Sequence, residues 1–264
     1  MPDTELKPDI YKIANCGPIR VWSVVVTILG DLCQNPDDFI PSRTLNVLVG
    51  KLGINNQALR VALHRLKRDG WIRAQRDGRT SNYYLSDQGR LMSESVRDQI
   101  YSKDQHKGVP MTMLMAPPQM PAAEFADCLP EEGVALSARV AIVTGPAQFP
   151  RDCLTLDFSP QNTPDWIIDS VAPYALQQEY AALEKAVKAA LKAPMPPTLT
   201  DRTAMRLVIL HHWRRLILRQ NILADLLLPP NWPGAQARRQ VMLALDRYER
   251  PQIDALNTFD AGAT

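Results

Sequence analysis

The stretch that decides the fold runs from Ile54 to Leu85 and reads INNQALRVALHRLKRDGWIRAQRDGRTSNYYL. Its first part carries apolar residues at spacings of three and four, which predicts an amphipathic helix with one buried stripe. Asn55 can cap the start of that helix, and Gly70 is well placed to end it. The expected stripe consists of Leu59, Ala62, Leu63 and Leu66.

Two more helices are expected before this one. IRVWSVVVTILGDL, from Ile19 to Leu32, is apolar almost all round, which predicts a buried helix. RTLNVLVGKLG follows, with Ser42 as its expected N-cap and Gly50 or Gly53 at its end. Two helices joined by a tight turn, the second with a polar and basic face, form the pattern of a helix-turn-helix.

A hairpin is expected directly after the basic helix. Trp71–Gln75 and Ser81–Leu85 are β-like, and Asp77-Gly78 stands between them. Asp-Gly between two such runs is a strong hairpin signal. An arginine-bearing hairpin in this place is typical of the wing of a winged helix, which reaches phosphates or the minor groove.

The charge of this region points to DNA. Seven Lys or Arg lie between Ile54 and Arg79 against Asp69 and Asp77, an excess of five, whereas the whole chain carries only +2. Arg can read guanine, and Asn or Gln can read adenine, in the major groove. A solvated basic surface, or a winged helix that docks a protein, is the alternative. The candidate DNA contacts are Ser42, Arg43, Asn55, Asn56, Gln57, Arg60, Val61, His64, Arg68, Arg73, Arg76, Arg79 and Ser81.

Composition fits a globular cytoplasmic protein. The chain has 264 residues, of which 45% are hydrophobic and 22% charged, enough for two or three small domains. The residues from Met1 to Lys12 are unlike a signal peptide, and the longest apolar run, Val24 to Leu29, is too short to span a membrane. The four cysteines are scattered singly, which favours reduced thiols over a metal site.

The pattern divides the chain into four parts. Residues 1–18 are expected as a loose tail, and 19–102 as the DNA-binding domain with a linker helix. Residues 108–170 are rich in proline, with short strands expected at Met111–Met115, Val140–Thr144 and Leu154–Phe158 and a helix at Ala122–Cys128. Residues 173–264 are helical again. The helices expected there are Tyr174–Leu191, Asp201–Leu218 and Gly234–Tyr248.

Two blocks of the sequence resemble the PaaX-like regulators, repressors of phenylacetate catabolism. The first is ILGDL with ALRVALHRLKRDGWIRAQRDGRTSNYYLSDQGR, and the second is HHWRRLILRQNILADLLLPPNWPGAQARRQVMLALDRY. Trp232-Pro233-Gly234 is the most specific part. The segment after Tyr101 departs from the family pattern, because it lacks the W-D-x-x-W type of opening.

The resemblance implies an α+β protein in three parts. These are an N-terminal winged helix-turn-helix, a ferredoxin-like middle domain related to a small CRISPR-associated nuclease fold, and a helical C-terminal domain for ligand response and dimerisation. It also implies a homodimer on operator DNA, which an acyl-CoA thioester such as phenylacetyl-CoA releases. An activator, or a regulator of another acyl-CoA pathway, stays open.

Catalysis is not expected. A metal-dependent nuclease, the enzymatic alternative, needs an acid at its first strand, and MTMLMAPP has none. His211 and His212 are adjacent and point about 100° apart on a helix, so a surface or hydrogen-bonded role is expected. No resident cofactor is expected. The cationic helix near the C-terminus supplies candidate effector contacts, with ion pairs to neighbouring acids as the alternative: Arg202, Arg206, Trp213, Arg214 and Arg215.

Overall fold

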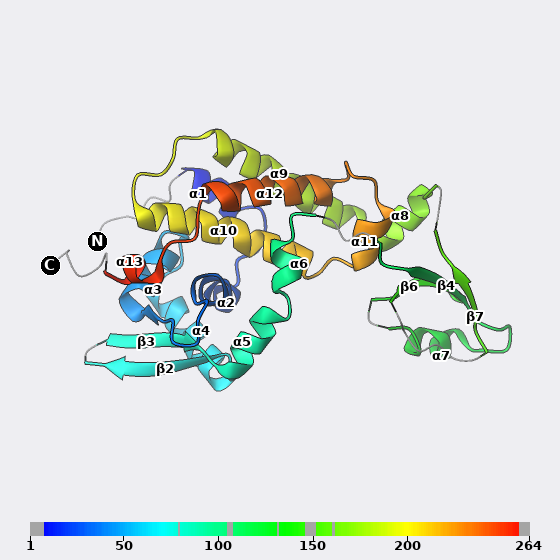
Figure 1. The fold of residues 1–264 in the computed structure, drawn as a ribbon, viewed down its shortest axis with the longest axis horizontal. Helices are drawn as coiled ribbons and strands as arrows, with labels where there is room; N and C mark the ends of the chain where they lie inside the picture. Colours follow the sequence, from blue (N-terminus) through cyan, green and yellow to red (C-terminus); the bar gives the residue numbers. More distant parts are fainter. Residues whose placement is uncertain are drawn as a thin grey trace. The chain divides into compact units, whose positions relative to one another are not determined.

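The computed structural model describes residues 8–78, 80–104, 108–130, 132–145, 152–159 and 162–258, and it divides the chain into two compact units (Figure 1). The first unit is made from Met1–Ser102, Ala181–Leu218 and Ala237–Thr264, and the second from Lys103–Tyr180 and Arg219–Gln236. The helical segment from 173 onward therefore contributes to both units. Both contain antiparallel sheets and helices, so the α+β class is confirmed.

The first unit is mainly helical, with one small sheet. Its helices are α1 (Pro8–Ala14), α2 (Val21–Leu32), α3 (Ser42–Gly50), α4 (Asn56–Arg68), α5 (Asp87–Glu94), α6 (Arg97–Tyr101), α10 (Leu199–Ile217) and α13 (Ile253–Thr258). Two longer helices, α9 (Tyr174–Lys192) and α12 (Pro233–Arg247), contribute residues to both units. α10 packs against α2, and both are buried on nearly every side, so they form the centre of this core.

The N-terminal segment differs from the expected loose tail. Residues 8–14 form α1, which packs against α10. Ile10 and Ile13 are buried, and their spacing of three places both on the face that meets the core. Two apolar residues in an otherwise polar stretch were too weak a signal for a helix, and contact with α10 stabilises it.

The predicted hairpin is confirmed. β2 (Ile72–Asp77) pairs antiparallel with β3 (Thr80–Leu85), and the register places Asp77 opposite Thr80. Gly78 has a φ of +56°, the left-handed conformation that a tight hairpin turn requires. β1 (Ile40–Pro41) adds a third strand beside β3, so the order is β1-β3-β2.

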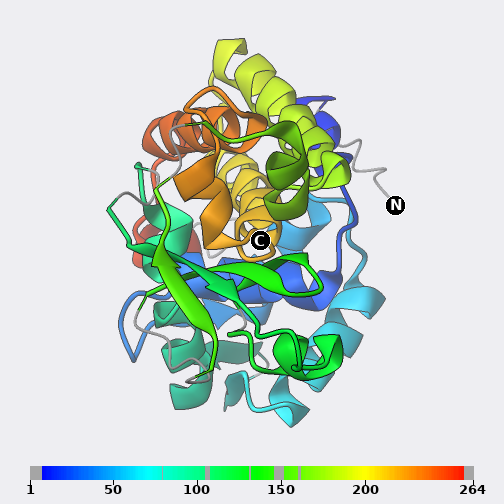
Figure 2. The same cartoon turned by 90° about the vertical axis from the view of Figure 1, so that its right-hand side faces the viewer.

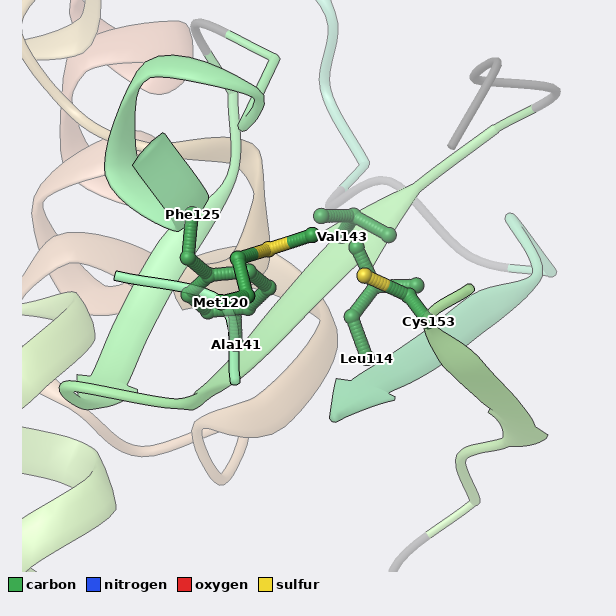
Figure 3. Close-up of a cluster of buried hydrophobic side chains, with 6 residues drawn as sticks. All are labelled: Leu114, Met120, Phe125, Ala141, Val143 and Cys153. Carbon is green, nitrogen blue, oxygen red and sulfur yellow. The ribbon is translucent and has the colours of Figure 1, made fainter. Parts of the chain in front are cut away.

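The second unit contains a four-stranded antiparallel sheet with the order β5-β6-β4-β7. Its elements, drawn in shades of green in Figure 2, are β4 (Met111–Met115), α7 (Ala122–Asp127), β5 (Val134–Ser137), β6 (Val140–Thr144), β7 (Leu154–Asp157) and α8 (Asp165–Val171). α11 (Ile222–Leu227) also belongs to this unit and packs against α8. Phe125 of α7 and Leu114 of β4 pack into one buried cluster with Val143 (Figure 3). Three of the strands lie where the sequence predicts them, whereas β5 was not predicted.

His211 and His212 are buried inside the first unit, which excludes the surface role for both, and His211 has the hydrogen-bonded role. His211 is 2% exposed, and its Nδ1 lies 3.4 Å from Oγ1 of Thr27 on α2. Burial, with a smaller contribution from neighbouring His212, lowers the pKa of His211 to about 3. The ring is therefore neutral at physiological pH and joins α10 to α2.

Candidate nucleic-acid interface

The helix α4 has the termini that the sequence predicts. Asn55 adopts an extended conformation, and its Oδ1 accepts a hydrogen bond from the backbone N–H of Ala58 at 2.8 Å, which makes it the N-cap. Gly70 follows the helix with a φ of +74°. The turn before α4 contains Gly53, with a φ of +77°, which lets α3 and α4 follow each other closely.

Ser42 is not the N-cap of α3, which corrects the sequence interpretation. The cap position is Pro41, and Ser42 is the first helical residue. The backbone of Pro41 is extended and pairs with Asn82 in the sheet, so the strand β1 fixes where the helix starts. The carbonyl of Ser42 accepts from Nδ2 of Asn46 at 2.7 Å.

The buried stripe of α4 separates two faces of the helix. Leu59 and Leu66 are 1% and 2% exposed, and the helix packs against α2 and β2. The opposite face is open to solvent, and even Val61 is 67% exposed there. Every candidate contact on α4 is exposed, as are Arg43, Asn55, Arg73 and Arg76, whereas Ser42 and Ser81 are half-buried. Arg79 lies outside the described residues.

The exposed face differs along α4 in how firmly its side chains are held. Nδ2 of Asn56 donates to Oδ1 of Asn46 on α3 at 2.7 Å, a bond that ties the two helices together. Near the other end, Nε of Arg68 lies 3.0 Å from Oδ1 of Asp69, and this hydrogen bond lowers the pKa of the Asp69 carboxyl. Among the residues that the structure describes, the side chains of Gln57, Arg60 and His64 make no hydrogen bond or ion pair, so they are available to a ligand.

In the hairpin, Arg73 is held by its own protein. Its guanidinium lies 4.1 Å from the centre of the Tyr84 ring, and Nη2 donates to the carbonyl of Pro36 at 3.3 Å. A guanidinium carries five N–H groups, so stacking on an aromatic ring orients it and leaves donors for a phosphate. Sequence reasoning missed Tyr84, whose ring lies beneath the Arg73 guanidinium, and Phe39, whose ring lies 5.4 Å from the Tyr84 ring.

Comparison with known proteins matches the two ends of the chain. The model of the PaaX-like protein family matches residues 20–89, and that of the PaaX-like protein C-terminal domain matches residues 173–254, together more than half of the chain. The chain belongs to the PaaX-like family. It is 25% identical to the transcriptional repressor PaaX of Escherichia coli strain K12, across 96% of this chain and 87% of that protein.

One solved structure extends the likeness of this PaaX-like chain to the fold. It is the uncharacterised protein Rv0674 from Mycobacterium tuberculosis, at a TM-score of 0.50 and 17% identity. The match covers 89% of this chain and 97% of that chain. At this identity the comparison concerns the fold alone, and it spans residues from both units of the PaaX-like chain.

The candidate effector residues of the PaaX-like chain lie in the protein interior or along its edge. Arg206 is 4% exposed, and its guanidinium donates to both carboxylate oxygens of Asp31, at 2.7 and 2.9 Å. Its Nη1 donates to the carbonyls of Leu245 and Tyr248, each at 3.0 Å. All of these acceptors belong to the protein. For Arg206, the structure therefore shows the alternative to an effector contact, an ion pair with an acid on a neighbouring helix.

The other four residues of that set make separate contacts within the described part of the chain. Trp213 is buried and donates from Nε1 to the carbonyl of Ile100 at 2.7 Å, and Arg202 donates to the carbonyls of Pro196 and Pro197. Arg215 packs closely against Gly17. Arg214 borders a cavity of about 20 Å³, which is the size of one water molecule. An effector role for these five residues stays a prediction.

Within the described ranges, no three His, Cys, Asp or Glu side chains gather so that they could hold a metal ion. Cys16, Cys33, Cys128 and Cys153 are free thiols, and burial raises the pKa of Cys33 to about 12. No helix in the part of the chain that the structure describes is long and apolar enough to cross a membrane.

Proposed function

We propose that this PaaX-like chain is a cytoplasmic transcription repressor that binds operator DNA through α3, α4 and the β2–β3 hairpin, used as a winged helix-turn-helix. The observation that carries the proposal is the open face of α4. It presents Gln57, Arg60 and His64 to solvent without partners among the described residues, beside a hairpin with exposed Arg73 and Arg76. The likeness to a transcriptional repressor supports the same reading.

In this proposal α4 is the recognition helix. The first half of a recognition helix meets the base edges in the major groove, and Gln57 and Arg60 lie in that half of α4. The bond between Asn56 and Asn46 fixes α4 against α3, so the two helices approach DNA as one rigid piece. The hairpin arginines then reach the phosphates or the minor groove beside the site.

The proposal extends to the rest of the chain. The strand order β5-β6-β4-β7, with all neighbours antiparallel, supports a ferredoxin-like middle domain with α7 as its first crossover helix. The connection from β6 to β7 contains residues 146–151, outside the described ranges. We further propose a homodimer on a pseudo-palindromic operator, because two symmetric half-sites combine two modest affinities.

A salt titration tests DNA binding directly. A labelled duplex, selected from a randomised pool by the full-length protein, is expected to bind with an affinity that falls steeply as salt rises. Each neutralised phosphate contributes about −0.9 to the slope of log affinity against log salt. An affinity that is independent of salt, or failure to select any duplex, would contradict the proposal and favour a protein-docking surface.

We propose phenylacetyl-CoA or a related acyl-CoA thioester as the effector and phenylacetate catabolism as the regulated process. An effector that binds better to a DNA-incompetent arrangement lowers operator affinity by that difference. Titration of a thioester panel against the protein–duplex complex is expected to release DNA, whereas free CoA and phenylacetate serve as controls. A panel without effect would remove the effector assignment and leave DNA binding intact.

A further inference from the structure

Residues 248–258 contact β1, the strand that pairs with β3 of the hairpin. We call residues 248–258 the C-terminal strap; it contains α13, which packs beside β1. Leu256 is 1% exposed, so it anchors the strap. Nδ2 of Asn257 donates a hydrogen bond to the carbonyl of Phe39 at 2.9 Å, across 218 positions of sequence. The strap therefore fixes the backbone where the chain enters β1.

A continuous set of contacts leads from Phe39 to the hairpin. The Phe39 ring lies 5.4 Å from the Tyr84 ring, and Tyr84 stands opposite Arg73 in the β2–β3 register. The Arg73 guanidinium stacks on the ring of this opposite residue, 4.1 Å from the centre of the Tyr84 ring. Its second contact, the carbonyl of Pro36, belongs to the loop that leads into Phe39. One support of Arg73, Pro36, thus belongs to the segment that Asn257 holds, and the other, Tyr84, packs against it.

From these contacts we infer that Asn257 is a positioning residue for Arg73. Through it, the C-terminal strap sets the orientation of the Arg73 side chain on the β2–β3 hairpin, the proposed wing. The inference rests on the proposed DNA-binding function. A long arginine side chain loses rotamer freedom when it binds a phosphate, and prior ordering removes that cost. Acting through Phe39 and Tyr84, Asn257 stabilises the DNA-bound conformation of the Arg73 side chain before DNA binds.

Asn257→Leu tests the inference without adding charge. The change removes the Nδ2 donor, and it also removes Oδ1, which is buried and accepts no hydrogen bond in the described part of the chain. The carbonyl of Phe39 loses a donor, which costs stability, and removal of the unpaired Oδ1 offsets part of that cost, so only a modest loss of stability is expected. Affinity for the selected duplex is expected to fall about two- to tenfold. Thr258→Ala is the matched control, because within the described ranges its hydroxyl bonds to the carbonyls of Asp254 and Ala255 of α13 and to no other group.

A double-mutant cycle with Arg73→Ala separates positioning from a general structural effect. If Asn257 acts through Arg73, Asn257→Leu is expected to weaken DNA binding in the wild-type background and to have no further effect in Arg73→Ala. An equal loss in both backgrounds, or no loss in either, would overturn the inference. Failure of the wild-type protein to bind DNA would instead overturn the proposed function, so the two results are distinguishable.

Discussion

Replacing Asp31 with Asn is expected to lower the free energy of unfolding by about 3–5 kcal/mol. Asp31 is 1% exposed on α2 and receives hydrogen bonds from Arg206, Arg250 and Tyr101. Its negative charge is what compensates the buried Arg206 guanidinium. An amide at this position leaves that cation without a counter-charge in the interior, which is the costly way to break a buried ion pair.

The same carboxylate gives a definite pH dependence. Burial alone would raise the pKa of Asp31, but the hydrogen bonds and charge of Arg206, helped by Arg250, hold it below the usual value. A depressed folded pKa means that the carboxylate stabilises the fold above its unfolded pKa of about 3.9. That contribution is lost as pH falls through the folded pKa. Asp31→Asn is therefore expected to flatten the acid side of the stability profile.

Urea denaturation at several pH values measures both effects. Substitutions of the two arginines that pair with the Asp31 carboxylate serve as controls. Arg206→Met removes a partner whose side chain is 5% exposed, whereas Arg250→Met removes one that is 30% exposed and 3.2 Å away. Arg206→Met is expected to destabilise the fold more than Arg250→Met. Equal and small effects of all three changes would show that Asp31 does not anchor the core.

The ion pair between Asp31 and Arg206 could not be predicted from the sequence. Asp31 stands in an apolar helix and its partner Arg206 lies 175 positions away, so no local pattern links them. α10 is buried on almost every side, and its arginines therefore do not stand out from the apolar residues around them as a solvent-facing stripe would. Read alone, the row of arginines left open an anionic ligand, solvent exposure or ion pairs to acids on neighbouring helices, and it could not name the partner of any one arginine. The structure shows that Arg206 faces a carboxylate of its own chain.

The elements that we propose to bind DNA were predictable because their signals are local. The three- and four-residue spacing of α4, the cap at Asn55 and the turn at Gly78 each act within a few residues. α1 depends instead on a distant partner, α10, and a contact of that kind leaves no local signal in the sequence. β5 pairs with the strand that directly follows it, β6, but it has only four residues, VALS, which is too short a run to show a clear alternation. The support of Arg73 by Tyr84 and the strap is likewise visible only in three dimensions.

Arg60→Ala is expected to weaken binding of the selected duplex by about 1–3 kcal/mol, or roughly five- to 150-fold, and to relax base preference. Arg60 is exposed in the first half of α4, and no described residue bonds its guanidinium. The fold should keep its stability, since an exposed substitution changes unfolding by about 0.5 kcal/mol or less. Lys185→Ala, an exposed cation on α9, is the control for lost charge.

Arg60→Lys separates a base contact from a phosphate contact. Lysine keeps the positive charge but cannot form the two parallel hydrogen bonds that a guanidinium makes with one guanine. If Arg60 reads a base, Lys is expected to lose base preference nearly as Ala does while keeping the slope of affinity against salt. If Arg60 contacts only phosphate, Lys retains both affinity and preference. An unchanged footprint and affinity in Arg60→Ala would show that Arg60 does not contact the DNA.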